Sequence, residues 1–143
     1  MNNVSIEFEG KKIEVKRRLG LVDTIGFVED MMGIVVDEEI GTYNPELLEF
    51  ARAAALLLRF TNFEPPKLNE QIDFAALFAL AMHTDLVSRV KEQLDGEMLD
   101  TLYLRAEERL DFMLYRMQNA NTMFGELIEA AIAQAALDEQ QPE

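Results

Sequence analysis

The segment over residues 44–63 constrains the fold most, because it forms a helix that is apolar around most of its circumference. Asn44 suits the N-cap and Pro45 the first helical position, where its missing N–H costs no hydrogen bond. Three charged side chains interrupt the apolar run behind this start: Glu49, Arg52 and Arg59. A helix that is apolar nearly all round lies inside a domain. We therefore predict a buried central helix over residues 45–62.

Residues 1–18 show the two-residue period of β-strands. Val4, Ile6 and Phe8 alternate with polar side chains, a turn follows at residues 9–11, and the alternation then resumes. This pattern predicts a β-hairpin with one apolar face. Because an isolated hairpin is only marginally stable in water, we expect that face to lie on the helices or on another chain.

The remaining sequence has mainly helical spacing, and a chain of 143 residues suits one domain. We predict N-terminal helices within residues 19–66, including the central helix at 45–62. A C-terminal helical part follows over 67–138, and a frayed tail over 139–143. The predicted fold is mainly α with a small N-terminal β-hairpin (α+β), a bundle of five or six helices around the central buried helix.

Three local features of these helices carry specific structural expectations. Gly26 and Gly33 are seven residues apart in one expected helix, where small residues allow another helix to approach closely. Asn69 is expected to cap the first helix of the C-terminal part. The sequence Asn119-Ala120-Asn121 is expected to separate a long amphipathic helix from a last one.

The charge is strongly negative, with 27 acidic and 13 basic residues and a net charge of −14. Five of the basic residues fall within residues 1–18, so the rest of the chain is still more acidic. Such a surface repels nucleic-acid phosphates and anionic membranes, which argues against direct binding to either. The simplest interpretation is that the charge keeps an apolar protein soluble, and the alternative is that an acidic face docks on a basic partner.

Membrane insertion and disulfide bonding are not expected from the sequence. The longest uncharged apolar run, residues 74–82, is far shorter than the roughly 20 residues that span a bilayer. The chain has no cysteine, which fits a reducing compartment. We therefore expect a cytoplasmic protein.

Catalytic patterns are scarce, and the sequence predicts no catalytic, cofactor-binding or metal-binding residues. The one histidine, His83, follows an apolar helical stretch, where a helix-end or core role is more common than a ligand role. Glu107, Glu108 and Asp111 alternate with arginines, a pattern typical of a solvated helix face with local ion pairs. The alternative is that these three carboxylates form an acidic protein-binding face. A small enzyme that uses carboxylates without a recognisable motif is the residual hypothesis.

The C-terminal helices carry an unusual supply of flexible apolar side chains. The candidate protein-binding residues on these helices are Met113, Met117, Phe124 and Ile128. Methionine-rich faces adapt to varied apolar partners, so one interpretation is that the last helices bind another protein or a second copy of the chain. The other interpretation is that the same residues fill a bundle core.

The N-terminal 66 residues carry a recognisable order of motifs: EVKRRLGL at the hairpin end, then FVEDMM, an acidic DEE turn, YNPELLEFA and TNFEPP. This order resembles small acidic hypothetical proteins of phages and prophages of Gram-positive bacteria. The resemblance covers the N-terminal half only. It implies a non-enzymatic viral protein that acts in the cytoplasm of the host cell.

Two roles fit this resemblance. The first is an assembly helper, such as a tail-assembly chaperone, which shields apolar helices of a viral structural protein. The alternative is an inhibitor of a basic host nucleic-acid enzyme, as in acidic anti-CRISPR proteins that mimic nucleic acid. Binding to a viral structural protein should resist salt, whereas mimicry of nucleic acid should weaken steeply with salt.

Overall fold

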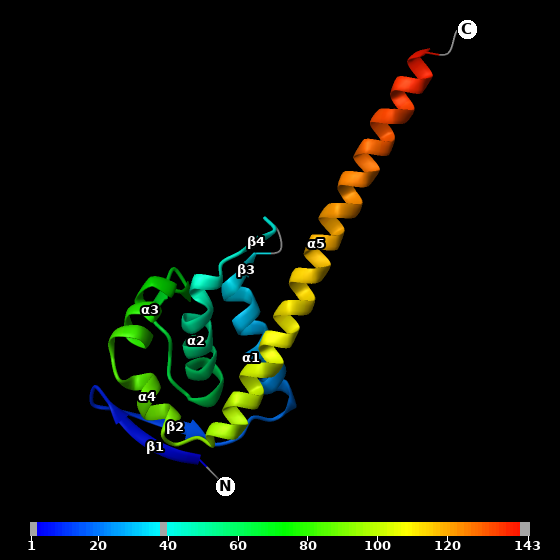
Figure 1. Cartoon of the computed structure of the whole chain (residues 1–143). Coiled ribbons are helices and arrows are strands. Elements are labelled where there is room, and N and C mark those ends of the chain that lie inside the picture. The colour runs from blue at the N-terminus through cyan, green and yellow to red at the C-terminus, as the bar shows by residue number, and fades with distance from the viewer. Residues whose placement is uncertain (1–2, 38–39, 141–143) are drawn as a thin grey trace. The chain divides into compact units, whose positions relative to one another are not determined.

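The computed structural model describes residues 3–37 and 40–140, without the side chains of residues 120–124 and 138–140. It divides into two compact units, Met1–Arg109 and Leu110–Glu143. The elements in chain order are β1 (Asn3–Phe8), β2 (Lys11–Lys16), α1 (Leu21–Val35), β3 (Val36–Asp37), β4 (Thr42–Tyr43), the 3₁₀ helix η1 (Pro45–Leu47), α2 (Leu48–Phe60), β5 (Lys67–Leu68), β6 (Gln71–Ile72), α3 (Phe74–His83), α4 (Leu86–Lys91) and α5 (Gly96–Gln140). The predicted fold class is confirmed: the described residues are mainly helical, with a small antiparallel hairpin at the N-terminus (Figure 1).

Helix α2 is the centre of the first unit, with α1 and α3 beside it (Figure 1). Most of its side chains are buried, including Leu56, Leu57 and Phe60, which have no exposed surface. The Phe60 ring meets the edge of Phe27 on α1 at a centroid distance of 5.9 Å. The predicted buried central helix is therefore confirmed.

The ends of this helix differ from the predicted range of 45–62. Its first turn is the 3₁₀ helix η1, and the Asn44 side chain makes no cap hydrogen bond. At the other end Thr61 takes an extended conformation and forms a β-bridge with Val15. The backbone leaves the helix at this point because it pairs with the hairpin instead.

The hairpin is held against the end of α2 by backbone pairing. Strands β1 and β2 pair with Val4 opposite Val15, and Ile6 opposite Ile13. The Glu14 N–H donates to the Asn62 side-chain oxygen at 2.9 Å, and the Asn62 N–H donates to the Glu14 carbonyl at 3.2 Å. Ile6, Ile13 and Val15 are buried, as expected for a hairpin whose apolar face is covered.

Helices α1 and α2 are also joined by an ion pair. The Arg59 Nε donates to Asp30 Oδ2 at 2.7 Å, and this hydrogen bond raises the pKa of the guanidinium. Gly26 makes room for it, since a Cβ there would lie 2.5 Å from Arg59 Cζ. Gly33 has no such role, because a Cβ there would meet nothing within 4 Å. The expectation that another helix approaches closely is thus wrong for Gly33. At Gly26 the close neighbour is the Arg59 side chain rather than the backbone of another helix.

The expected cap at Asn69 is wrong. Asn69 and Glu70 have φ values of 54° and 67° and form the turn between β5 and β6. Helix α3 begins later, where the Asp73 carboxylate accepts a hydrogen bond from the Ala76 N–H at 3.1 Å. Aspartate and asparagine are about equally good N-caps, and asparagine also tolerates a positive φ, so tertiary context decides between the two positions.

The expected interruption at residues 119–121 is also wrong, because α5 continues through it to Gln140. Asparagine lowers helix propensity by only about 0.7 kcal/mol relative to alanine, which does not end a helix without a proline or a competing cap. The predicted frayed tail over 139–143 begins inside α5, and residues 141–143 lie outside the described structure.

Candidate protein-binding surface

The second unit consists, as far as it is described, of the C-terminal part of α5, residues 110–140. At about 100° per residue, apolar side chains spaced by three and four positions fall on one side of this helix. We call this side the C-terminal apolar face. Its described members are Leu110, Met113, Leu114, Met117, Leu127, Ile128 and Ile132.

The second half of this face is open to solvent. The exposed fraction is 66% for Leu127, 45% for Ile128 and 65% for Ile132. Met113 and Met117 are half-buried. The predicted binding residue Phe124 lies among residues whose side chains the structure does not describe.

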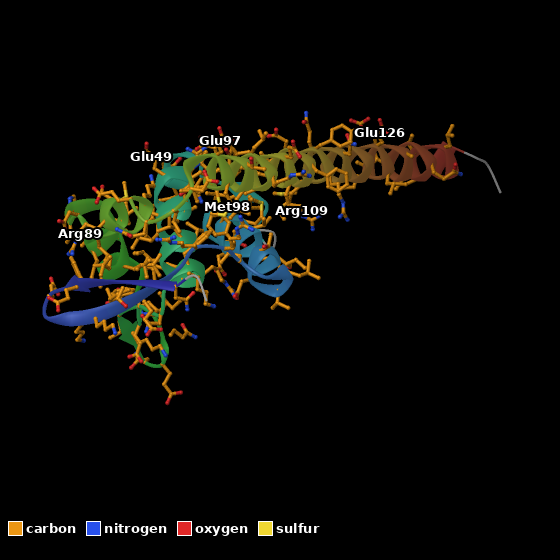
Figure 2. The ribbon with its side chains drawn as sticks, turned by 90° about the horizontal axis from the view of Figure 1, so that it is seen from below. Glu49, Arg89, Glu97, Met98, Arg109 and Glu126 are labelled. Atoms are coloured by element: carbon orange, nitrogen blue, oxygen red, sulfur yellow. The ribbon has the colours of Figure 1, made fainter. Side chains whose placement is uncertain are left out.

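The opposite side of the same helix is mixed, with exposed acidic side chains and the exposed apolar side chains Phe112, Tyr115 and Leu137. Asp111, Glu126 and Glu129 lie there by helical spacing and are exposed. Glu126 extends from the helix in Figure 2. The Arg116 guanidinium lies over the Phe112 ring, 5.9 Å from its centroid. This part of α5 therefore has one wide apolar face and an opposite side on which acidic and aromatic side chains are mixed.

The apolar side of this helix bears on the stability of the helix. An isolated helix is marginally stable in water, and most helical stability in proteins comes from packing of the apolar face. Within the described residues of the second unit, no other helix or strand exists to cover that face. Leu110, at the start of this face, is buried, whereas Leu127, Ile128 and Ile132 are exposed.

The binding residues predicted from the sequence make up only part of this face. Ile128 is a predicted binding residue; Ile132, four residues on, lies directly beside it, and Leu127, three residues after the predicted Phe124, lies at the edge of the same face. Their exposure is the information that the sequence lacked. The spacing alone fits a bundle core equally well.

The three predicted acidic residues lie in different surroundings. Glu107 forms an ion pair with Arg52 of α2, and each of these side chains is about one-third exposed. Glu108 and Asp111 are exposed. The pairing of Glu107 inside the first unit leaves it less available to a basic partner than a solvated carboxylate.

Tyr103 packs beside this ion pair, with the Arg52 guanidinium 5.3 Å from its ring centroid. Burial raises the pKa of Tyr103 to about 12, although the nearby positive charge of Arg52 opposes the shift. In the described structure the Tyr103 hydroxyl and Arg52 Nε are buried without a hydrogen-bond partner. Such groups are costly, and this cluster belongs to the packing between α2 and α5.

His83 and the acidic side chains are the residues from which a metal-binding site could be built in this chain. His83 is exposed at the end of α3, where its ring contacts Phe78 at a centroid distance of 6.1 Å. No three acidic or histidine side chains of the described ranges are placed to hold a metal ion. Within the same ranges, no helix is both long enough and apolar enough to cross a membrane.

No protein-family model, curated protein or solved structure matches this chain.

Proposed function

We propose that this protein is a non-enzymatic binding protein that holds an apolar helical segment of another protein against its C-terminal apolar face. The observation that carries the proposal is the exposure of Leu127, Ile128 and Ile132 on a helix that is the single element among the described residues of its unit. The hairpin and the core around α2 belong to the first compact unit of the chain.

A face of this composition suits an assembly helper or chaperone. Methionine side chains adapt to different apolar partners, and branched aliphatic side chains supply most of the buried area. The high negative charge keeps such a protein dispersed while its apolar face is free. The resemblance of the N-terminal half to phage and prophage proteins makes a viral structural protein the partner that we propose, inside the cytoplasm of the host cell.

A fluorescent amphipathic peptide of leucine, alanine and lysine can test this proposal by fluorescence anisotropy. We expect binding to change little between about 0.1 and 1 M salt, because apolar contacts are not screened. Replacing Leu127, Ile128 and Ile132 together with glutamine removes the buried area but keeps the helix propensity. Loss of roughly 1 kcal/mol for each side chain weakens binding by at least about 100-fold.

The matched control replaces Glu126 and Glu129 with glutamine on the opposite side of the same helix. These changes should leave the peptide affinity within about twofold at high salt. Equal losses in both variants would contradict an apolar binding face. Binding that disappears at high salt in the wild-type protein would support the alternative, an acidic inhibitor of a nucleic-acid enzyme.

A second copy of the chain is the other partner to distinguish. Sedimentation of the wild-type and triple-glutamine proteins over a range of concentrations provides this test. A dimer that dissociates only in the triple variant would identify the face as a homodimer interface and would replace the helper proposal.

A further inference from the structure

The first unit contains a cavity of about 840 Å³ that the proposed binding function does not use. We call it the arginine pocket and define it by six of its lining residues. They are Arg17, Arg18, Phe60, Met98, Leu102 and Arg105. All of them belong to the first unit.

Three separate parts of the fold bring the arginines and the apolar floor together. Arg17 and Arg18 follow the last residue of β2, in the bend before α1. Arg105 lies on α5, two helical turns beyond Met98. Figure 2 shows Met98 on the side of α5 that faces the other helices of this unit, whereas Glu97 points away. Phe60, from the end of α2, is fully buried and packs behind the pocket wall.

The charges of this pocket are not balanced from within the protein. The half-buried arginines of the core, Arg52 and Arg59, both pair with carboxylates. In contrast, Arg17, Arg18 and Arg105 have no ion pair or hydrogen bond among the described residues. All three arginines line the same pocket, and an anion bound there would be attracted by each of them.

Two carboxylates also lie along the pocket edge. The Asp95 side chain accepts a hydrogen bond from the Glu97 N–H at 3.0 Å, so it is engaged at the start of α5. Glu92 is exposed at the rim. Against three arginines these acids leave the pocket with a net positive charge, in a chain whose net charge is −14.

We propose that the arginine pocket binds a small organic phosphate. Planar guanidinium groups match phosphate oxygens through paired charge-assisted hydrogen bonds, and Arg17, Arg18 and Arg105 supply them. Met98 and Leu102, which are partly exposed, provide an apolar floor for the organic part of the ligand. The volume lies within the range of about 300–1,000 Å³ that is usual for small-molecule sites. A nucleic acid is disfavoured because the rest of the chain would repel its extended phosphate backbone.

Hexyl phosphate and inorganic phosphate are suitable probes for isothermal titration calorimetry of the full-length protein at low salt. Hexyl phosphate should bind more tightly than inorganic phosphate, because only the former reaches the apolar floor. Replacement of Arg17, Arg18 or Arg105 with glutamine should weaken hexyl phosphate binding by about tenfold each. These side chains are exposed, so circular dichroism should show that the variants keep their fold.

Arg109→Gln is the matched control, since Arg109 is exposed on the same helix one turn beyond Arg105 and does not line the pocket. The control should bind hexyl phosphate as the wild type does. Absence of binding for both probes at millimolar concentration would overturn the proposal. Equal weakening by Arg109→Gln and Arg105→Gln would also overturn it, because the attraction would then be non-specific.

Discussion

Two glycines of α1 that look equivalent in the sequence should respond oppositely to alanine. Alanine favours a helix by about 1 kcal/mol over glycine. At Gly33 a Cβ meets nothing within 4 Å, so Gly33→Ala should raise the free energy of unfolding by about 0.5–1 kcal/mol. At Gly26 the Cβ would lie 2.5 Å from Arg59 Cζ and 2.6 Å from Nη1, so the guanidinium must move.

The cost of that movement can be worked from the contacts of Arg59. Displacement breaks the 2.7 Å hydrogen bond to Asp30, and both side chains are partly exposed, with 33% and 22% of their surfaces accessible. A charge-assisted hydrogen bond in such surroundings contributes about 1–2 kcal/mol. The helix-propensity gain is therefore cancelled or reversed. Gly26→Ala should be neutral or destabilising by up to about 1 kcal/mol.

Urea unfolding followed by far-ultraviolet circular dichroism measures this difference directly. The two variants should differ by about 1–2 kcal/mol, which is the cost of the lost hydrogen bond, provided that the denaturant slope is unchanged. In an Arg59→Met background, Gly26→Ala should become stabilising, because no guanidinium occupies the space. Equal stabilisation by both alanines in the wild-type background would refute the reasoning.

Further predictions concern the buried cluster of α2 and α5. Tyr103→Phe removes a buried hydroxyl without a hydrogen-bond partner and should stabilise the protein by about 1 kcal/mol in thermal melts. Because the pKa of Tyr103 is about 12 when folded and about 10 when unfolded, stability should fall as pH rises from 10 to 12, by at most about 3 kcal/mol. Alkaline urea titrations should show a smaller loss in Tyr103→Phe. Glu107→Gln, which unpairs Arg52, should cost roughly 0.5–1 kcal/mol, whereas the exposed Glu108→Gln should be neutral.

The core of the fold could be predicted from the sequence because its signals are local and redundant. The alternation around Val4 and Ile6 predicts that one face of the hairpin is buried. The apolar run of α2 predicts that this helix is buried on most sides. Helix boundaries were less predictable, because they depend on distant pairing. Thr61 leaves the helix to pair with Val15, and Asn69 forms a turn rather than a cap.

The two candidate sites could not be predicted from the sequence, because they depend on which side chains are exposed and on which distant residues line one pocket. Helical spacing cannot distinguish a core from an open face, so the state of Ile128 became known only from its exposure. Arg105 appeared in the sequence as one base among neighbouring acids. Its position beside Arg17 and Arg18 follows from tertiary packing and has no sequence signal.

The most direct test of the proposed binding function is hydrogen exchange of the backbone amides in residues 125–137, with and without the amphipathic peptide. In the free protein these amides should exchange quickly, because an unpartnered helix opens readily. Saturating peptide should slow their exchange by at least about tenfold, and the triple glutamine variant should show no slowing. Slow exchange in the free monomer, unchanged by peptide, would contradict a C-terminal face that is completed by another protein.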